Sequence, residues 1–225
     1  MNTATLADEL QQQGYATRSL LDPDACRALI DLYDQPGPFR KCVVMERHGY
    51  GLGEYQYFAY PLPAPVARLR DSLYPALAVI ANQWRQALGQ APSFPATLSE
   101  YTARCHAAGQ TKPTPLLLRY GPGGFNCLHQ DLYGEHVFPL QMAVLLSDPV
   151  TDFSGGEFVL VEQRPRAQSR VSVVPLRQGE AVIFPVRERP NRGARGYHRV
   201  VMRHGVSRLH TGHRHTLGII FHDAA

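Results

Sequence analysis

Apolar and polar positions follow different periods in the two halves of the chain. In residues 65–89, apolar side chains recur every three or four positions, which predicts a long helix with one apolar face. Pro75 is expected to kink or divide this helix. Shorter helices are predicted at residues 5–13 and 22–33 from their apolar spacing and end signals. After residue 90, short apolar runs alternate with Gly, Pro, Asp and Asn, which predicts strands and turns.

Two strands are predicted before the long helix, at residues 15–21 and 41–46, and eight in the second half of the chain. These eight span residues 116–120, 125–131, 140–146, 157–161, 170–174, 181–184, 199–203 and 216–221. Strands at this spacing are typical of a β-sandwich or jelly roll. Residues 48–60 carry five aromatic side chains. Two interpretations fit this segment: a loop near a functional site, or a pair of strands that buries its rings in the core.

Composition adds bounds on domain number and compartment. A chain of 225 residues with 44% hydrophobic content fits one domain with a substantial core. The four cysteines form no CxxC pair, and we see neither a secretion signal nor an apolar run long enough to span a membrane. We therefore expect a cytoplasmic protein that does not insert into a membrane.

Arginine dominates the basic residues. Residues 161–215 contain twelve arginines and three acidic residues, a local balance of +9. Such a patch could contact phosphates or an acidic partner, or it could be a solvated surface. Nucleic acid is thus one expected partner class, and oligomeric state is left open.

A chemical signature follows the predicted strand at residues 116–120. A Gly-Pro-Gly-Gly turn leads to His129 and Asp131, which would point to the same face of an extended segment. An imidazole and a carboxylate on one face are two ligands of the 2-His-1-carboxylate triad that holds non-haem Fe(II). The third ligand must come from later in the chain.

His198 and His204 are the two candidates for the third ligand. The usual co-substrate of such irons is 2-oxoglutarate, whose distal carboxylate needs a cation, and the planar fork of arginine suits it best. Arg214 lies ten residues after His204 and sixteen after His198, and the hydroxyl of Thr216 would share its strand face. The spacing favours His204.

These motifs, in this order, resemble the Fe(II)/2-oxoglutarate-dependent dioxygenase superfamily. The resemblance is closest to the prolyl-hydroxylase-like branch, which has Arg-Tyr-x-x-Gly before the HxD motif and Ser-Gly-Gly-Glu after it. Here these elements are residues 119–123 and 154–157. Residues 45–49, 168–170, 203–207 and 218–223 are also similar to a bacterial family labelled a nucleic-acid oxygenase.

The resemblance implies a mostly β fold with N-terminal helices, in which a double-stranded β-helix (a cupin-like jelly roll) is packed by helices. We expect one dioxygenase domain over residues 1–225, with residues 1–114 as N-terminal support and substrate loop and residues 115–225 as the jelly-roll core. The enzyme would be an oxidoreductase that uses Fe(II), 2-oxoglutarate and O2 and releases succinate and CO2.

The resemblance also assigns the site residues. His129, Asp131 and His204 would bind the iron, and no further catalytic residue is needed. Arg214 would bind the distal carboxylate of 2-oxoglutarate, with Tyr120 and Thr216 as hydrogen-bond partners. Cys127 could line the site or pack beside it.

Several substrates and roles fit these motifs. One candidate is a hydroxylase or oxidative demethylase of alkylated nucleic acid. The alkylation-repair enzymes, however, carry a second arginine six residues after the arginine that binds 2-oxoglutarate, here called the anchor. The anchor in this chain is Arg214, and the position six residues later is Ile220. A peptidyl-prolyl or small-molecule hydroxylase of the same chemistry is another. A cupin-like metal sensor would not require Arg214, and structural zinc at Cys127, His129 and Asp131 would lack a second pair of ligands.

Overall fold

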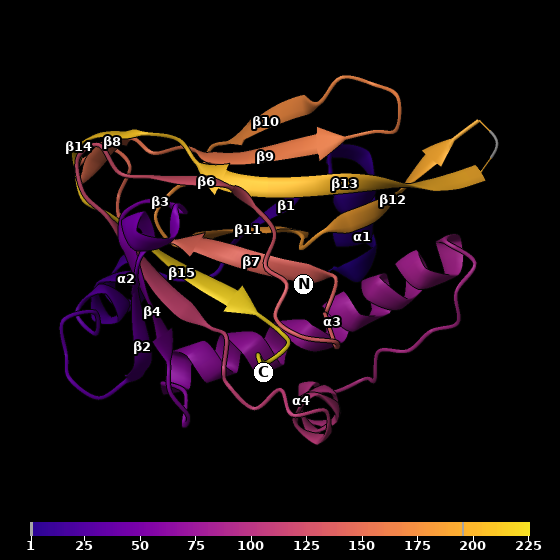
Figure 1. The fold of residues 1–225 in the computed structure, drawn as a ribbon, viewed down its shortest axis with the longest axis horizontal. Helices are drawn as coiled ribbons and strands as arrows, with labels where there is room; N and C mark the ends of the chain where they lie inside the picture. Colours follow the sequence, from indigo (N-terminus) through magenta and orange to yellow (C-terminus); the bar gives the residue numbers. More distant parts are fainter. Residues whose placement is uncertain (1, 195) are drawn as a thin grey trace.

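Two antiparallel sheets lie face to face, and helices cover the outer side of the larger one (Figure 1). The computed structural model describes residues 2–194 and 196–225. The larger sheet has the strand order β1-β11-β7-β15-β5-β4-β2, and the smaller one the order β10-β9-β13-β6-β3, with β12 paired to β13. The predicted fold class, a helix-packed jelly roll, is confirmed.

The strand bounds fall into three groups. The larger sheet contains β1 (Ala16–Ser19), β2 (Phe39–Val44), β4 (Glu54–Phe58), β5 (Leu116–Tyr120), β7 (Leu140–Leu145), β11 (Glu180–Pro185) and β15 (Arg214–Ile220). The smaller sheet contains β3 (Gly51–Leu52), β6 (Phe125–His129), β9 (Phe158–Gln163), β10 (Arg170–Val174), β12 (Glu188–Gly193) and β13 (Gly196–Val206). A third pair joins β8 (Phe153–Gly155) and β14 (Leu209–Gly212).

The helices are α1 (Thr3–Gln13), α2 (Pro23–Ile30), α3 (Ala64–Ala87) and α4 (Leu98–Ala107), with a 3-10 turn, η1 (Met45–His48). Asn2 and Asp22 cap α1 and α2 through their side chains, which bond to backbone N–H groups of the first turn. Figure 1 shows α3 running along the outer face of the larger sheet. None of the helices in the described residues has the length and hydropathy needed to cross a membrane.

Side-chain alternation on the larger sheet builds two separate cores. On β15, Leu217 and Ile219 point outward and pack in the cluster that the helices complete. Their neighbours Thr216 and Ile220 point the other way, toward the smaller sheet. The core between the sheets is formed by alternate residues of β7, β9, β11 and β13. The sheet thus separates a helix-covered side from an inner side that contains a cavity.

Several predicted elements differ from the observed ones. The sequence reading placed no helix after residue 90, yet α4 is present, and its start has a capping box formed by Thr97 and Glu100. Pro75 does not divide α3, because it lies on the exposed side, where water can bond to the freed carbonyl group. Strands β8, β12 and β14 were also missed, since they lack an apolar run. The strand expected at residues 125–131 ends at His129.

The aromatic segment at residues 48–60 combines both predicted roles. Tyr57 and Phe58 lie on β4 and are buried, as the strand reading expected. Tyr50 is 48% exposed and lies at the edge of the inner cavity, as the loop reading expected. The division of the domain at residue 114 stays a prediction, although β1 to β4 belong to the two sheets.

A buried ion pair ties the end of β15 to the helical layer. The Arg70 guanidinium lies 2.7 Å from the Asp223 carboxylate, and both side chains are at most 3% exposed. Tyr60 donates to the same carboxylate at 2.8 Å, and Arg70 donates to the carbonyl groups of Ile220 and Phe221. The strand that carries Arg214 is therefore held by α3 at its far end.

We expect the Arg70→Ala substitution to destabilise the fold, because it removes the guanidinium from the buried Asp223 carboxylate and leaves only the Tyr60 hydroxyl and the His106 imidazole in contact with it. Breaking one side of a buried pair costs about 3–5 kcal/mol. For a chain of this size, that lowers the melting temperature by roughly 6 to 20 °C. Thermal unfolding measures the shift. Arg27→Ala, which removes an exposed pair with Asp24, is the control and should change little.

Candidate active site

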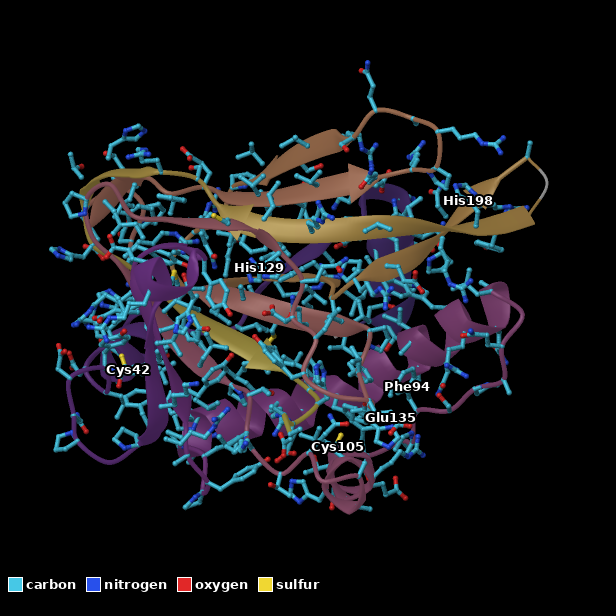
Figure 2. The ribbon with its side chains drawn as sticks, in the orientation of Figure 1. Cys42, Phe94, Cys105, His129, Glu135 and His198 are labelled. Carbon is cyan, nitrogen blue, oxygen red and sulfur yellow. The ribbon has the colours of Figure 1, made fainter. Side chains whose placement is uncertain are left out.

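His129, Asp131 and His204 converge between the two sheets. His129 ends β6 and is the register partner of His204 on β13, and their rings lie 4.1 Å apart. Asp131 follows β6 in the next loop, and one potential ligand atom from each of the three residues lies within 4.8 Å of the others. Figure 2 shows His129 in the space between the sheets. Two imidazoles and one carboxylate in this arrangement fit a non-haem Fe(II) ion.

Hydrogen bonds orient the two imidazoles. His129 Nδ1 lies 2.8 Å from the Cys127 carbonyl oxygen, to which it donates as Nδ1–H, so Nε2 is the free ligand atom. His204 Nε2 lies 3.3 Å from Asp131 Oδ2, and His129 Nε2 lies 3.6 Å from Asp131 Oδ1. His204 Nδ1 is buried and has no partner among the described residues. Both Nε2 atoms thus face the carboxylate.

The electrostatics of the triad favour the protonation states that bind a metal. Burial works to raise the pKa of Asp131, but the hydrogen bond and charge of the neighbouring imidazoles and the Tyr133 hydroxyl outweigh it, and the pKa is lowered. Burial lowers the pKa of His204, with His129 adding to the effect. An ionised carboxylate beside a neutral imidazole is the form in which both groups coordinate a cation.

A tyrosine relay supports the carboxylate. The Tyr133 hydroxyl donates to Asp131 Oδ1 at 2.8 Å, and the Tyr57 hydroxyl donates to the Tyr133 oxygen at 3.0 Å. Burial and the Asp131 charge raise the pKa of Tyr133, so its proton stays available for donation. The sequence reading missed both tyrosines, although the position of Tyr133 two residues after Asp131 was a usable signal.

We expect Tyr133→Phe to lower metal affinity about 10- to 100-fold, because the phenylalanine ring fills the same space and only the bond to Asp131 is lost. Anaerobic titration with Fe(II) or Co(II) measures the affinity. Tyr57→Phe is the matched control, since it leaves Tyr133 able to donate, and its loss should be smaller. Equal affinities for Tyr133→Phe and the unmodified protein would contradict a supporting role.

The competing ligands lie elsewhere. His198 is on the hairpin of β12 and β13, where its ring lies 3.4 Å from the Asn191 amide nitrogen. In Figure 2 it lies at the far end of the smaller sheet from His129. The Cys127 side chain is exposed at the cavity edge and is outside the group of potential metal ligands found in the described residues.

Arg214 carries a buried guanidinium that is in direct contact with no carboxylate of the described residues. It is 2% exposed, forms none of the ion pairs found among the described residues, and its Nε has no hydrogen-bond partner. Its Nη1 donates to the Thr216 hydroxyl at 2.5 Å, and its Cζ lies 5.8 Å from the centre of the Tyr120 ring. Burial lowers the pKa of Arg214 and raises that of Tyr120 to about 12. A buried cation with free donors is a site for an anionic ligand.

Two glycines leave room for these anchor side chains. Gly156, at φ +65°, lies where a Cβ atom would come within 3.1 Å of Arg214 Cδ. Gly53, at φ +147°, lies where a Cβ atom would come within 2.8 Å of the Tyr120 ring. Positive φ and close approach both favour glycine. The Ser-Gly-Gly-Glu element thus contributes space beside Arg214.

One cavity of about 460 Å³ joins the triad to the anchor. All six residues singled out from the sequence line it: Tyr120, His129, Asp131, His204, Arg214 and Thr216. Leu116, Leu118, Phe158 and Phe184 are among its apolar lining residues. The volume falls in the range of ligand pockets, and the few polar groups are gathered at defined points.

The profile of Oxygenase-NA, described as an oxygenase catalysing oxidative methylation of damaged DNA, matches residues 53–224. The chain belongs to the Oxygenase-NA family. The motifs resembled the Fe(II)/2-oxoglutarate-dependent dioxygenase superfamily, and this prediction is confirmed. The protein is an oxygenase and hence an oxidoreductase.

Two relatives match most of the chain, and solved structures share its fold. Two uncharacterized proteins of Mycobacterium tuberculosis, MT2286 and Rv2227, are each 52% identical over 168 residues, which cover 75% of this chain and 72% of theirs. A prolyl-4-hydroxylase of Pseudomonas putida has a TM-score of 0.55 at 15% identity, with 96% of both chains covered. A 2OG-Fe(II) family oxidoreductase of Burkholderia pseudomallei has a TM-score of 0.51 at 14% identity, covering 100% of this chain and 93% of that one. The Oxygenase-NA chain therefore has the fold of these oxygenases.

Proposed function

We propose that this Oxygenase-NA protein is an Fe(II)/2-oxoglutarate-dependent dioxygenase that oxidises a C–H bond on a damaged nucleobase. The observation that carries the reaction class is the single cavity that joins a 2-His-1-carboxylate triad to an unpaired buried arginine. A metal sensor of the same fold would have no use for a carboxylate-binding group at that position. When bound, the iron, 2-oxoglutarate and O2 supply the oxidation, with release of succinate and CO2.

Each part of the chain has a defined task in this reaction. His129, Asp131 and His204 would hold the iron, and Tyr133 would keep the carboxylate oriented. Arg214 would bind the distal carboxylate of 2-oxoglutarate, and Tyr120 and Thr216 lie beside its guanidinium. The apolar wall between them would exclude water, which strengthens the electrostatic contacts inside.

The edge of the cavity supports a nucleobase as substrate. The rings of His48 and Tyr50 stack at 5.2 Å with an interplanar angle of 22°, and Tyr50 is 48% exposed. An exposed aromatic platform of this kind can stack on a base. Leu128 and Leu132 add apolar surface at the same edge.

Arginines near this edge support contact with a phosphate backbone. The Gln130 amide, which lines the cavity, donates to the carbonyl groups of Arg187 and Met202. The backbone of Arg187 and of Met202, the residue before Arg203, therefore lies next to a residue that lines the cavity. Arg187 and Arg203 are both exposed, as is Arg47 beside His48. Exposed guanidinium groups around a site attract the phosphates of a nucleic acid.

We also assign the protein to the cytoplasm, because its four cysteines are free and two are exposed.

The experiment compares substrates in one assay. The protein is loaded with Fe(II) without oxygen, and 2-oxoglutarate is added to look for the visible iron–keto-acid band. Succinate is then measured in air with methylated single-stranded oligonucleotides and with proline-containing peptides. We expect the band, and more succinate with the methylated oligonucleotides. Absence of the band would contradict the reaction class, whereas stimulation by the peptides alone would contradict the nucleobase.

Tyr50→Ala supplies the matched variant for the substrate. It should weaken stimulation by the oligonucleotide and leave the band unchanged, since Tyr50 lies at the edge and not among the metal or anchor residues. Loss of stacking costs about 1–3 kcal/mol per base, or roughly 5- to 150-fold in the oligonucleotide concentration required.

A further inference from the structure

Gln141 is a buried polar side chain that no residue of the described chain satisfies. It lies on β7 and is 2% exposed, and neither its Nε2 nor its Oε1 has a hydrogen-bond partner. The side chain lines the inner cavity. Buried amides are almost always hydrogen-bonded, because an unmet donor or acceptor is unfavourable. An occupant of the cavity is the remaining partner.

Strand register locates Gln141 beneath the triad. Its register partners are Phe184 on β11 and Ile220 on β15. The Phe184 ring lies 4.7 Å from the His204 ring, and Ile220 packs in the same cluster as Tyr133. One neighbour of Gln141 therefore packs against the ligand His204, and the other packs near Tyr133, which bonds to the ligand Asp131.

Gln141 and Arg214 lie at opposite ends of the same sheet face. Between Cα atoms, Ile220 is about 20 Å along β15 from Arg214 at roughly 3.3 Å per residue. The Arg214 guanidinium reaches the Thr216 hydroxyl, whose residue is only about 13 Å from Ile220 at the same rise. Thr216 and Gly218 line the cavity between them. A distal carboxylate bound by Arg214 is thus out of reach of Gln141, which lies near the end of the cavity that holds the potential metal ligands.

We propose that the Gln141 carboxamide binds the keto-acid end of 2-oxoglutarate, with Nε2 donating to its carboxylate. This inference rests on the proposed function. The co-substrate would then be held at both ends, by a guanidinium at one and by an amide at the other. The amide would fix its orientation before the substrate enters.

The primary substrate is the rival occupant, and burial argues against it. Exposed side chains mark the open edge of the cavity, where Tyr50, Leu128 and Leu132 are 48%, 47% and 43% exposed. Gln141 is on the opposite wall, which belongs to the sheet that carries Arg214 and Thr216. A substrate entering at the edge meets the triad first, whereas a co-substrate lying along this sheet meets Gln141.

The test is an anaerobic titration of the Fe(II)-loaded protein with 2-oxoglutarate, followed by the visible band. Gln141→Leu removes both hydrogen-bonding groups at similar size and should raise the dissociation constant of 2-oxoglutarate about 10- to 100-fold. Gln141→Glu keeps the shape and places a carboxylate against a carboxylate, so its loss should be at least as large. Gln163→Leu, at the exposed end of β9, should match the unmodified protein. Affinity for Mn(II) without 2-oxoglutarate should be unchanged in Gln141→Leu and Gln163→Leu.

The outcomes separate this inference from the proposed function. A band in the unmodified protein, with Gln141→Leu titrating within twofold of it, overturns the role of Gln141 alone. So does a variant that changes only the requirement for oligonucleotide, which would assign the amide to the primary substrate. No band in the unmodified protein overturns the proposed function itself. If Gln141→Leu does not fold, judged by thermal unfolding, the Gln141→Glu titration decides in the same way.

Discussion

The Arg214→Ala variant is expected to bind 2-oxoglutarate at least about 30-fold more weakly, because truncating a buried, hydrogen-bonded charge removes about 2–5 kcal/mol or more from an ionic contact. The guanidinium is the buried cation of the cavity, and no carboxylate of the described residues already occupies it. The band titration measures the affinity, and succinate release should fall in parallel.

Two further variants test the reason for this loss. Arg214→Lys keeps the charge but not the planar fork, so it should recover only part of the affinity. Arg203→Ala removes an exposed arginine of β13 and should leave 2-oxoglutarate binding unchanged. Normal binding by Arg214→Ala would show that the co-substrate does not use this end of the cavity.

Removing one triad ligand is expected to abolish iron binding. Loss of a residue that only supports a ligand lowers metal affinity about 10- to 100-fold. His204→Ala removes a ligand itself, so it should lower the affinity for Fe(II) by more than about 100-fold. Because His204 Nε2 faces the Asp131 carboxylate, the alanine variant leaves two of the three ligands. Anaerobic Fe(II) titration, with the metal content measured after desalting, gives the affinity.

His198→Ala is the decisive control for this prediction. The two histidines share β13 and were separated in the sequence only by their spacing to Arg214. In the structure, His198 lies beside Asn191 on the far hairpin. Iron affinity should therefore survive its removal, and a loss in His198→Ala with none in His204→Ala would reverse the assignment.

Local patterns were sufficient for the strands that carry the site. The predicted strand at residues 116–120 begins with an apolar run at residues 116–118 and is followed by a glycine turn, and the structure contains β5 over the same five residues. The spacing of His129 and Asp131 was informative although the strand ends between them, because the loop keeps both side chains in the cavity. The order of the motifs along the chain was therefore enough to predict these two site residues.

The supporting contacts could not be read from the sequence. Tyr57 on β4 contacts Tyr133 in the loop after β6, and these two residues are 76 positions apart in the chain, so only the tertiary fold brings them together. Gln141 looked like an ordinary polar residue in an apolar strand, and only its buried, unpartnered amide sets it apart. The missed helix α4 is different, since the capping box at Thr97 and the apolar spacing after it were visible.

The two binding functions of the cavity belong to different sheets. His129 and His204 are on the smaller sheet, whereas Arg214, Thr216 and Tyr120 are on the larger one. A co-substrate that contacts both the iron and Arg214 would be a cross-link between the halves of the sandwich. Its binding free energy would then add to that of folding, and the melting temperature should rise more with iron and 2-oxoglutarate together than with either alone.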